Sequence, residues 1–281
     1  MQSLWELRRR PLSLVLRLLT YGAALATLAV ILMILGFILI RGIPNLTPSL
    51  FAWEYTPENG SMTPALINTV IMTLLTLLIA IPLGIFAAIY LTEYTRRGNR
   101  LVTITRLAAE TLAGIPSIIY GLFGMLLFVF YFQWGYSLLA GACTLAIMIL
   151  PLIIRTTEEA ILSVPDTYRE ASFGLGAGRL RTVFVIVLPS AIPGILAGVI
   201  LAIGRIVGET AALIFTASTL PQLPTNLFSS TRTMSVLMYA LATEGLYIEQ
   251  AYATAAVLLG LVIVINLFSK WLASRITKKN S

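Results

Sequence analysis

Six long apolar stretches restrict what this sequence can fold into. They cover residues 18–40, 65–91, 107–132, 137–154, 190–217 and 251–272. An α-helix rises about 1.5 Å per residue and the hydrocarbon core of a bilayer is about 30 Å thick, so stretches of this length can cross it. The sequence therefore predicts an all-α integral membrane protein with six transmembrane helices.

The distribution of basic residues predicts how these helices are oriented. Sixteen of the 19 Lys and Arg residues flank the apolar stretches in four groups, whereas only Arg41 and Arg232 fall in the segments between those groups. Loops rich in Lys and Arg stay in the cytoplasm, so we expect a multi-pass protein of the cytoplasmic (inner) membrane with both termini inside. The groups are Arg8, Arg9, Arg10 and Arg17; Arg96, Arg97, Arg100 and Arg106; Arg155, Arg169, Arg179 and Arg181; and Lys270, Arg275, Lys278 and Lys279.

This topology divides the chain into five parts. We expect a cytoplasmic tail at 1–17, a first transmembrane helix at 18–40 and an external loop at 41–64. A five-helix core follows at 65–272, with a cytoplasmic loop at 155–189, and a basic cytoplasmic tail covers 273–281. The net charge of +7 is then explained by the lipid bilayer as partner, and we expect no nucleic-acid partner.

Composition argues against an enzyme. The chain has no histidine and a single cysteine, Cys143, so the commonest general base and the usual metal ligands are missing. We predict no catalytic residues and no metal site.

The loop 155–189 is too long for a turn and too short for a domain. Thr156 and Glu159 have the spacing of a capping box, which predicts a short helix ending at Leu162, and Pro165 predicts that a second helix starts after a break at 163–164. Gly176 permits a tight bend beyond it. The apolar side chains of these helices need a cover, which is either a partner protein or the lipid headgroups.

The order of residues in this loop resembles the EAA signature of binding-protein-dependent ABC importer permeases. The signature is matched by Glu170-Ala171-Ser172, Gly176 and Ile186-x-Leu188-Pro189, with Ser172 as the one departure from its usual alanine. The resemblance implies a type I ABC importer permease fold in which the loop docks on a cytoplasmic ATPase. The residues implied in this coupling are Tyr168, Glu170, Ala171, Phe173 and Gly176.

The chain has no Walker-type phosphate-binding motif of its own. We therefore expect no cofactor to be bound by this chain, and ATP and Mg²⁺ to be bound by the partner ATPase.

Arg205 is a charged residue inside the fifth apolar stretch. An arginine at mid-membrane depth costs roughly 2.5–3.5 kcal/mol on insertion scales, so it should face protein and have a partner. Glu209 lies four residues on, one helical turn away, and the pair either locks helices together or handles an anionic substrate. Gly194 with Gly198, and Gly204 with Gly208, would let another helix approach closely. In the same way Arg106 and Glu110 are spaced for an ion pair in the third stretch.

Three further segments resemble phosphate-specific ABC permeases of the PstA type. They are Gly204-Arg205-Ile206-Val207-Gly208-Glu209-Thr210-Ala211 with Leu213–Ala217, Leu112-Ala113-Gly114-Ile115-Pro116-Ser117 with Tyr120–Phe123, and Ile81–Gly84 with Ala88–Leu91. Ala212 stands where that family usually has proline. The resemblance implies a substrate pathway containing Arg205, Glu209, Ser117 and Thr210. It also implies a heterodimer with a PstC-type permease, two copies of a PstB-type ATPase and an external PstS-type phosphate-binding protein.

These observations predict the permease subunit of an ATP-driven importer of inorganic phosphate. Two alternatives stay open at this point. The first is an importer of another oxyanion, sulfate or molybdate, because guanidinium chemistry does not distinguish them. The second is a transporter or channel that works without ATP, against which the coupling signature argues.

Overall fold

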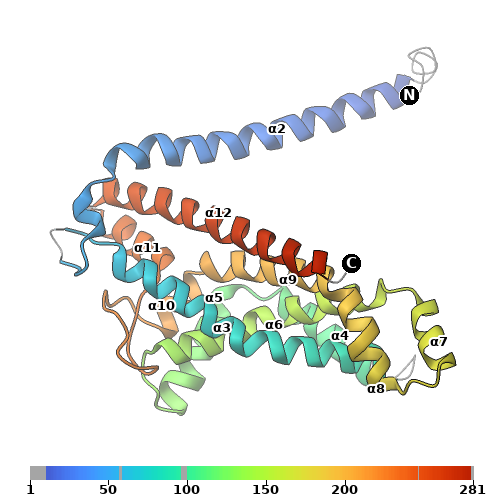
Figure 1. Cartoon of the computed structure of the whole chain (residues 1–281). Helices are drawn as coiled ribbons and strands as arrows, with labels where there is room; N and C mark the ends of the chain where they lie inside the picture. The colour runs from blue at the N-terminus through green and yellow to red at the C-terminus, as the bar shows by residue number, and fades with distance from the viewer. Residues whose placement is uncertain (1–10, 57–58, 96–99, 246, 280–281) are drawn as a thin grey trace.

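The computed structural model describes residues 11–56, 59–95, 100–245 and 247–279, and all regular structure in these ranges is helical (Figure 1). Several α-helices continue into π-helical segments. The elements are α2 (Pro11–Gly42), the 3₁₀ turns η1 (Ile43–Asn45) and η2 (Pro48–Phe51), α3 (Thr63–Ile89) with η3 (Tyr90–Tyr94), α4 (Arg100–Ala113), α5 (Ser117–Gly124) with η4 (Met125–Tyr131), α6 (Leu138–Leu162), α7 (Asp166–Gly174), α8 (Arg179–Thr182) with η5 (Val183–Val187) and α9 (Leu188–Val207), α10 (Ala211–Thr216), α11 (Met234–Glu244) and α12 (Ile248–Lys279).

Five helices in the described ranges are long and apolar enough to cross a membrane. They are α2, α3 with η3, α6, the continuous rod from α8 to α9, and α12. A sixth span is obtained when α4 and α5 are counted as one bent pair. The all-helical fold is confirmed, and the expected six spans correspond to this upper count.

The span expected over 107–132 is broken into two helices in the structure. The two helices in this region, α4 and α5, meet at an angle of 102°. Pro116 has an extended conformation (φ −58°, ψ 141°), lacks an N–H group and disfavours helical geometry at Ile115 before it. The hydroxyl of the buried Tyr120 donates to the Leu112 carbonyl at 2.8 Å, which bridges the break.

Helix α6 forms the centre of the protein. Two thirds of its most apolar 18-residue window is buried, and it packs against α3 on one side and α9 on another. A side chain at Gly198 of α9 would begin 2.1 Å from the Thr156 hydroxyl oxygen of α6, and one at Gly194 would begin 2.6 Å from Ala160 Cβ. The predicted close approach at this glycine pair is therefore confirmed. At Gly204, by contrast, no heavy atom of the described chain lies within 4 Å of an added Cβ.

The predicted loop 155–189 is much shorter in the structure. Helix α6 continues to Leu162, and the next long helix begins at Arg179, so the connection covers only 163–178 with α7 in its middle. Thr156 does not start a helix, because its hydroxyl donates back to the Leu152 carbonyl at 2.9 Å within α6. The predicted break at 163–164 and the new helix after Pro165 are confirmed.

The fifth span is shifted relative to the expected range of 190–217. It starts at Arg179 and ends at Val207, where Gly208 terminates α9, and the separate short helix α10 follows after Glu209 and Thr210.

Two further differences concern the ends of the predicted membrane segments. Helix α11 lies between the fifth and sixth apolar stretches, and its Met234, Leu237 and Leu241 pack with Leu50 and Met62 in a second buried cluster. Helix α2 begins at Pro11, within the predicted tail 1–17. The remainder of that tail, residues 1–10, and most of the basic turn at 95–100 lie outside the described residues.

Helix α2 projects away from the other helices (Figure 1). None of its most apolar 18-residue window is buried. It touches the bundle near its C-terminal end, where Phe37 and Tyr252 of α12 have ring centroids 5.7 Å apart and Gly42 lies against the Tyr252 backbone. The first residues of α2, the end of α12 and α7 all lie at the same end of the structure (Figure 1).

Candidate functional site

Arg205 lines a cavity of about 580 Å³ that lies between α4, α6 and α9. Because α9 ends at Val207, Arg205 sits in its last turn. Five of the other residues that line the cavity are charged. They are Arg106, Glu110, Arg155, Glu158 and Glu159.

Most of these charges are already neutralised. Arg106 Nε donates to Glu158 Oε1 at 2.8 Å, and Glu158 is largely buried. Arg155 Nε lies 3.1 Å from Glu159 Oε1, and both of these side chains are 65% exposed. Within the described ranges, Arg205 forms no ion pair and no side-chain hydrogen bond, although its charge acts on the nearby Tyr120. Its guanidinium is therefore available to a ligand in this cavity.

The predicted ion pair between Arg205 and Glu209 is absent from the described part of the structure. Since α9 ends between these residues, Glu209 no longer lies on the same helical face. Its Oε1 accepts a hydrogen bond from the Ala212 backbone N–H at 3.2 Å, and its carbonyl accepts one from Ser235 Oγ at 2.6 Å. Glu209 is 9% exposed, so its buried carboxylate stabilises the start of α10 instead of neutralising Arg205.

Ser117 and Thr210 are not among the residues that line this cavity. Ser117 opens α5 directly after Pro116, and Thr210 precedes α10. These two short helices pack closely, because Gly121 of α5 leaves no room for a side chain against Ala212. Of the four residues predicted for the substrate pathway, Arg205 is therefore the one that lines this cavity. The roles of the other three stay predictions.

Glu110 lines the same cavity as Arg205. It was expected to pair with Arg106, but the structure pairs Arg106 with Glu158 of α6 instead. The reason is geometric: α4 lies against α6, so the arginine reaches a largely buried carboxylate on the neighbouring helix.

Helix α7 carries the residues expected to dock on an ATPase. Tyr168 and Phe173 are half-exposed, Leu175 is 90% exposed, and Glu170 and Ala171 also face outwards. Gly176 has φ +81°, a left-handed conformation that glycine adopts without strain, so the bend predicted there is confirmed. This apolar outer surface has no cover within the described chain. Its role in coupling stays a prediction.

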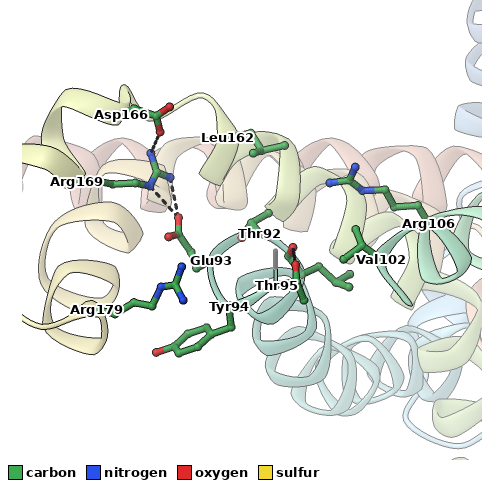
Figure 2. A pocket seen from close by; sticks show the side chains of 11 residues that line it. Thr92, Glu93, Tyr94, Thr95, Val102, Arg106, Leu162, Asp166, Arg169 and Arg179 are labelled. Carbon is green, nitrogen blue, oxygen red and sulfur yellow. Dashed lines mark hydrogen bonds and ion pairs between the residues drawn. The ribbon is translucent and has the colours of Figure 1, made fainter. Parts of the chain in front are cut away.

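The inner face of α7 contains contacts that the sequence did not predict. Arg169 forms an ion pair with Glu93 of η3, with 2.7 Å between Nη2 and Oε1 (Figure 2). Ser172 is buried and lies 2.8 Å from the Thr182 hydroxyl. Arg169 and Glu93 are 76 residues apart, so no local pattern pointed to the pair. Ser172 did give a signal, since it is the departure from the EAA signature.

Comparison with known proteins finds a matching family model and similar permeases. The family model described as "Binding-protein-dependent transport system inner membrane component" matches residues 80–278. The probable ABC transporter permease protein YqgI of Bacillus subtilis (strain 168) is 37% identical over 92% of this chain and 94% of its own length. The phosphate transport system permease protein PstA of Pasteurella multocida (strain Pm70) is 36% identical over 84% of this chain and 85% of its own.

Solved structures show the same fold. A bacterial alginate ABC transporter in complex with its pentasaccharide-bound periplasmic protein has a chain that superposes with a TM-score of 0.68, covering 98% of both chains at 19% identity. An inward-facing MetNI methionine ABC transporter gives a TM-score of 0.57, covering 87% of this chain and 97% of that one at 19% identity. Together with the family match, these similarities and the apolar helices show that the chain is a multi-pass inner-membrane protein that belongs to the family of binding-protein-dependent transport system inner membrane components.

Proposed function

We propose that this chain is the permease subunit of an ATP-driven importer of inorganic phosphate. The observation that carries the proposal is the Arg205 guanidinium, which lines a cavity beside the fifth span and has no carboxylate partner in the described ranges. The similarity of most of the chain to permeases named PstA supports phosphate as the cargo.

A guanidinium suits this cargo for physical reasons. Its planar fork can donate two parallel hydrogen bonds to a tetrahedral oxyanion, and it stays charged at any physiological pH. An unpaired arginine in a membrane protein is also costly, and an arriving anion would offset part of that cost. Glu209, Ser117 and Thr210 would contribute at the edge of the path, where α5 and α10 meet.

The energy would come from a separate protein. In this proposal the exposed surface of α7, with Tyr168, Glu170, Ala171, Phe173 and the bend at Gly176, docks on a cytoplasmic ATPase that binds ATP and Mg²⁺. The end of the structure with α7, the start of α2 and the end of α12 would then be cytoplasmic, as its basic residues suggest. The full importer would contain a PstC-type permease, two PstB-type ATPase copies and an external PstS-type binding protein.

The test is phosphate uptake by the complete importer reconstituted in liposomes. Arg205→Ala should abolish uptake while the complex still assembles. Arg155→Ala is the matched control, because it removes an arginine from the same cavity that is exposed and already paired with Glu159. Normal uptake by Arg205→Ala would exclude Arg205 as the phosphate contact.

The same preparation separates the alternatives. ATPase stimulation should be measured with phosphate, sulfate and molybdate, each with its binding protein. Stimulation by sulfate or molybdate alone would reassign the cargo and keep the mechanism. Uptake without ATP or without the ATPase subunits would show a transporter or channel that works alone.

A further inference from the structure

Two residues on the inner face of α7 contact the rest of the described protein, and both are polar. Of the nine residues of α7, only Arg169 and Ser172 are not exposed. They are three positions apart and so share one face of the helix. Ser172 contacts Thr182 of α8, whereas Arg169 reaches in the other direction, to the end of α3.

Arg169 connects three segments through its guanidinium. Its Nε and Nη2 donate to Glu93 Oε1 at 3.0 and 2.7 Å. Nη2 also donates to the Ile161 carbonyl of α6 at 3.0 Å, and Nη1 donates to the Val164 carbonyl at 2.8 Å. The ion pair is shielded from water, since the Arg169 and Glu93 side chains are only 14% and 10% exposed. A shielded, charge-assisted contact of this kind is stronger and more directional than a surface ion pair.

Glu93 lies on an unusual piece of backbone. It belongs to η3, the π-helical turn that ends α3, and π turns within helices are frequently found at functional positions. The same turn carries Tyr94, whose ring lies 5.6 Å from the guanidinium carbon of Arg179 in α8. The end of α3 is therefore tied both to α7, within the 163–178 connection, and to α8, which follows that connection.

This link lies beside a cavity of about 880 Å³ that is lined by residues of η3, α4, α6, α7 and α8 (Figure 2). The apolar side chains of α7 itself are exposed, whereas Val164 and Val183, on either side of the α7–α8 segment, pack in one buried cluster with Ile89 of α3. Among the described residues, the ion pair is therefore a direct side-chain contact between α7 itself and the end of α3.

We propose that the Arg169–Glu93 ion pair is the joint through which movement of α7 reaches α3, which makes both of them positioning residues for coupling. Helix α3 packs along α6, the central helix of the bundle, so a pull on Glu93 acts directly on the core beside the Arg205 cavity. This inference rests on the proposed function, in which an ATPase moves α7.

The experiment measures phosphate taken up per ATP hydrolysed by the complete importer in liposomes. Glu93→Gln removes the charge but leaves Arg169 bound to the Ile161 and Val164 carbonyls, so α7 should keep its place. We expect uptake per ATP to fall about fivefold or more, the usual size of a coupling effect, with ATPase association unchanged. The control is Asp166→Asn, which removes another carboxylate bound to Arg169, at 3.2 Å, and leaves the Arg169–Glu93 ion pair intact.

Combining two variants tests whether they act through one contact. Arg169→Gln should lower the same ratio, and the double variant with Glu93→Gln should be no worse than Arg169→Gln alone. Three results would overturn the proposal: an unchanged ratio in Glu93→Gln, additive losses in the double variant, or loss of ATPase association in Glu93→Gln, which would show a purely structural role.

Two measurements keep this proposal separate from the proposed function. The first is phosphate-dependent ATPase activity of the unmodified complex, without which the proposed function itself fails. The second is ATPase association in Phe173→Asp, which changes the outer face of α7 and leaves the joint intact. If Phe173→Asp still holds the ATPase firmly, α7 is not the docking helix, whatever the Glu93 variants show.

Discussion

Helices α6 and α7 follow one another in the chain but are held in opposite ways. In α6, side chains such as Leu145 and Ile149 are completely buried, and neighbouring helices approach through glycines. In α7, all residues except Arg169 and Ser172 are exposed. Many weak contacts between closely packed side chains hold α6 in place. By contrast, a few directional bonds hold α7. The difference shows how one chain can combine a rigid membrane core with a helix that can be moved.

The largest effect is expected from emptying the core of α6. Leu145 is 0% exposed, and Leu145→Ala should destabilise the protein by about 2–5 kcal/mol through the cavity it leaves. Thermal unfolding of the purified protein in detergent would measure this. Leu175→Ala, beyond α7, is the matched control, because that leucine is 90% exposed and should have almost no effect. Equal losses for the two variants would contradict the contrast between the helices.

A smaller loss is expected from crowding the contact between α6 and α9. In Gly198→Val the new side chain would collide with Thr156, and overpacking of this kind costs about 1–3 kcal/mol. The control is Gly260→Ala in α12, where an added Cβ meets nothing within 4 Å. If Gly198→Val unfolds at the same temperature as the unmodified protein, α6 and α9 do not pack as described.

Removing one hydrogen bond that holds α7 should destabilise the protein less than either of the two changes above. Ser172→Ala deletes the hydrogen bond to Thr182, whose hydroxyl keeps its bond to the Gly178 carbonyl at 3.2 Å. We expect a loss of about 0.5–1.5 kcal/mol, measured as above with the exposed Thr167→Ala for comparison. Hydrogen exchange should also become faster within α7 and not within α6. Faster exchange in both helices would mean that α7 is not attached independently.

The smallest effect concerns two neighbouring acids at the end of α6. Glu159→Gln removes an ion pair with Arg155 in which both side chains are 65% exposed, so its contribution should be below about 0.5 kcal/mol and fall with added salt. Glu158→Gln should cost more, because the Glu158 side chain is 10% exposed and holds Arg106 of α4. Unfolding curves at low and high salt would compare them. A larger loss of stability in Glu159→Gln than in Glu158→Gln would contradict the view that the buried ion pair contributes more than the exposed one.

Much of the fold could be predicted from local sequence patterns. Apolar length located the membrane-crossing helices, and the helix break at 163–164, the new helix after Pro165 and the bend at Gly176 follow from capping and backbone preferences of single residues. The family was predicted from the EAA signature in the same segment. Arg205 was also singled out correctly as a charge in an apolar span that needs an explanation, because the cost of an arginine in a membrane does not depend on the details of packing.

The partners of these residues could not be predicted in this way. The sequence alone suggested pairs four positions apart, Arg205 with Glu209 and Arg106 with Glu110, whereas the folded chain uses Glu209 to cap α10 and Glu158 to hold Arg106. The third span bends because of Pro116. The direction of that bend depends on how α4 packs against α6.

The sequence by itself therefore determined that this chain crosses a membrane, roughly where most of its membrane-crossing helices lie and to which family it belongs, because these depend on the contact of each segment with lipid and on short motifs. Only the tertiary structure decided that Arg205 lines a cavity and has no carboxylate partner among the described residues, and that Arg169 is bound to Glu93, 76 residues away. Contacts of this kind depend on how whole helices pack, and one glycine or proline in a distant segment can change them.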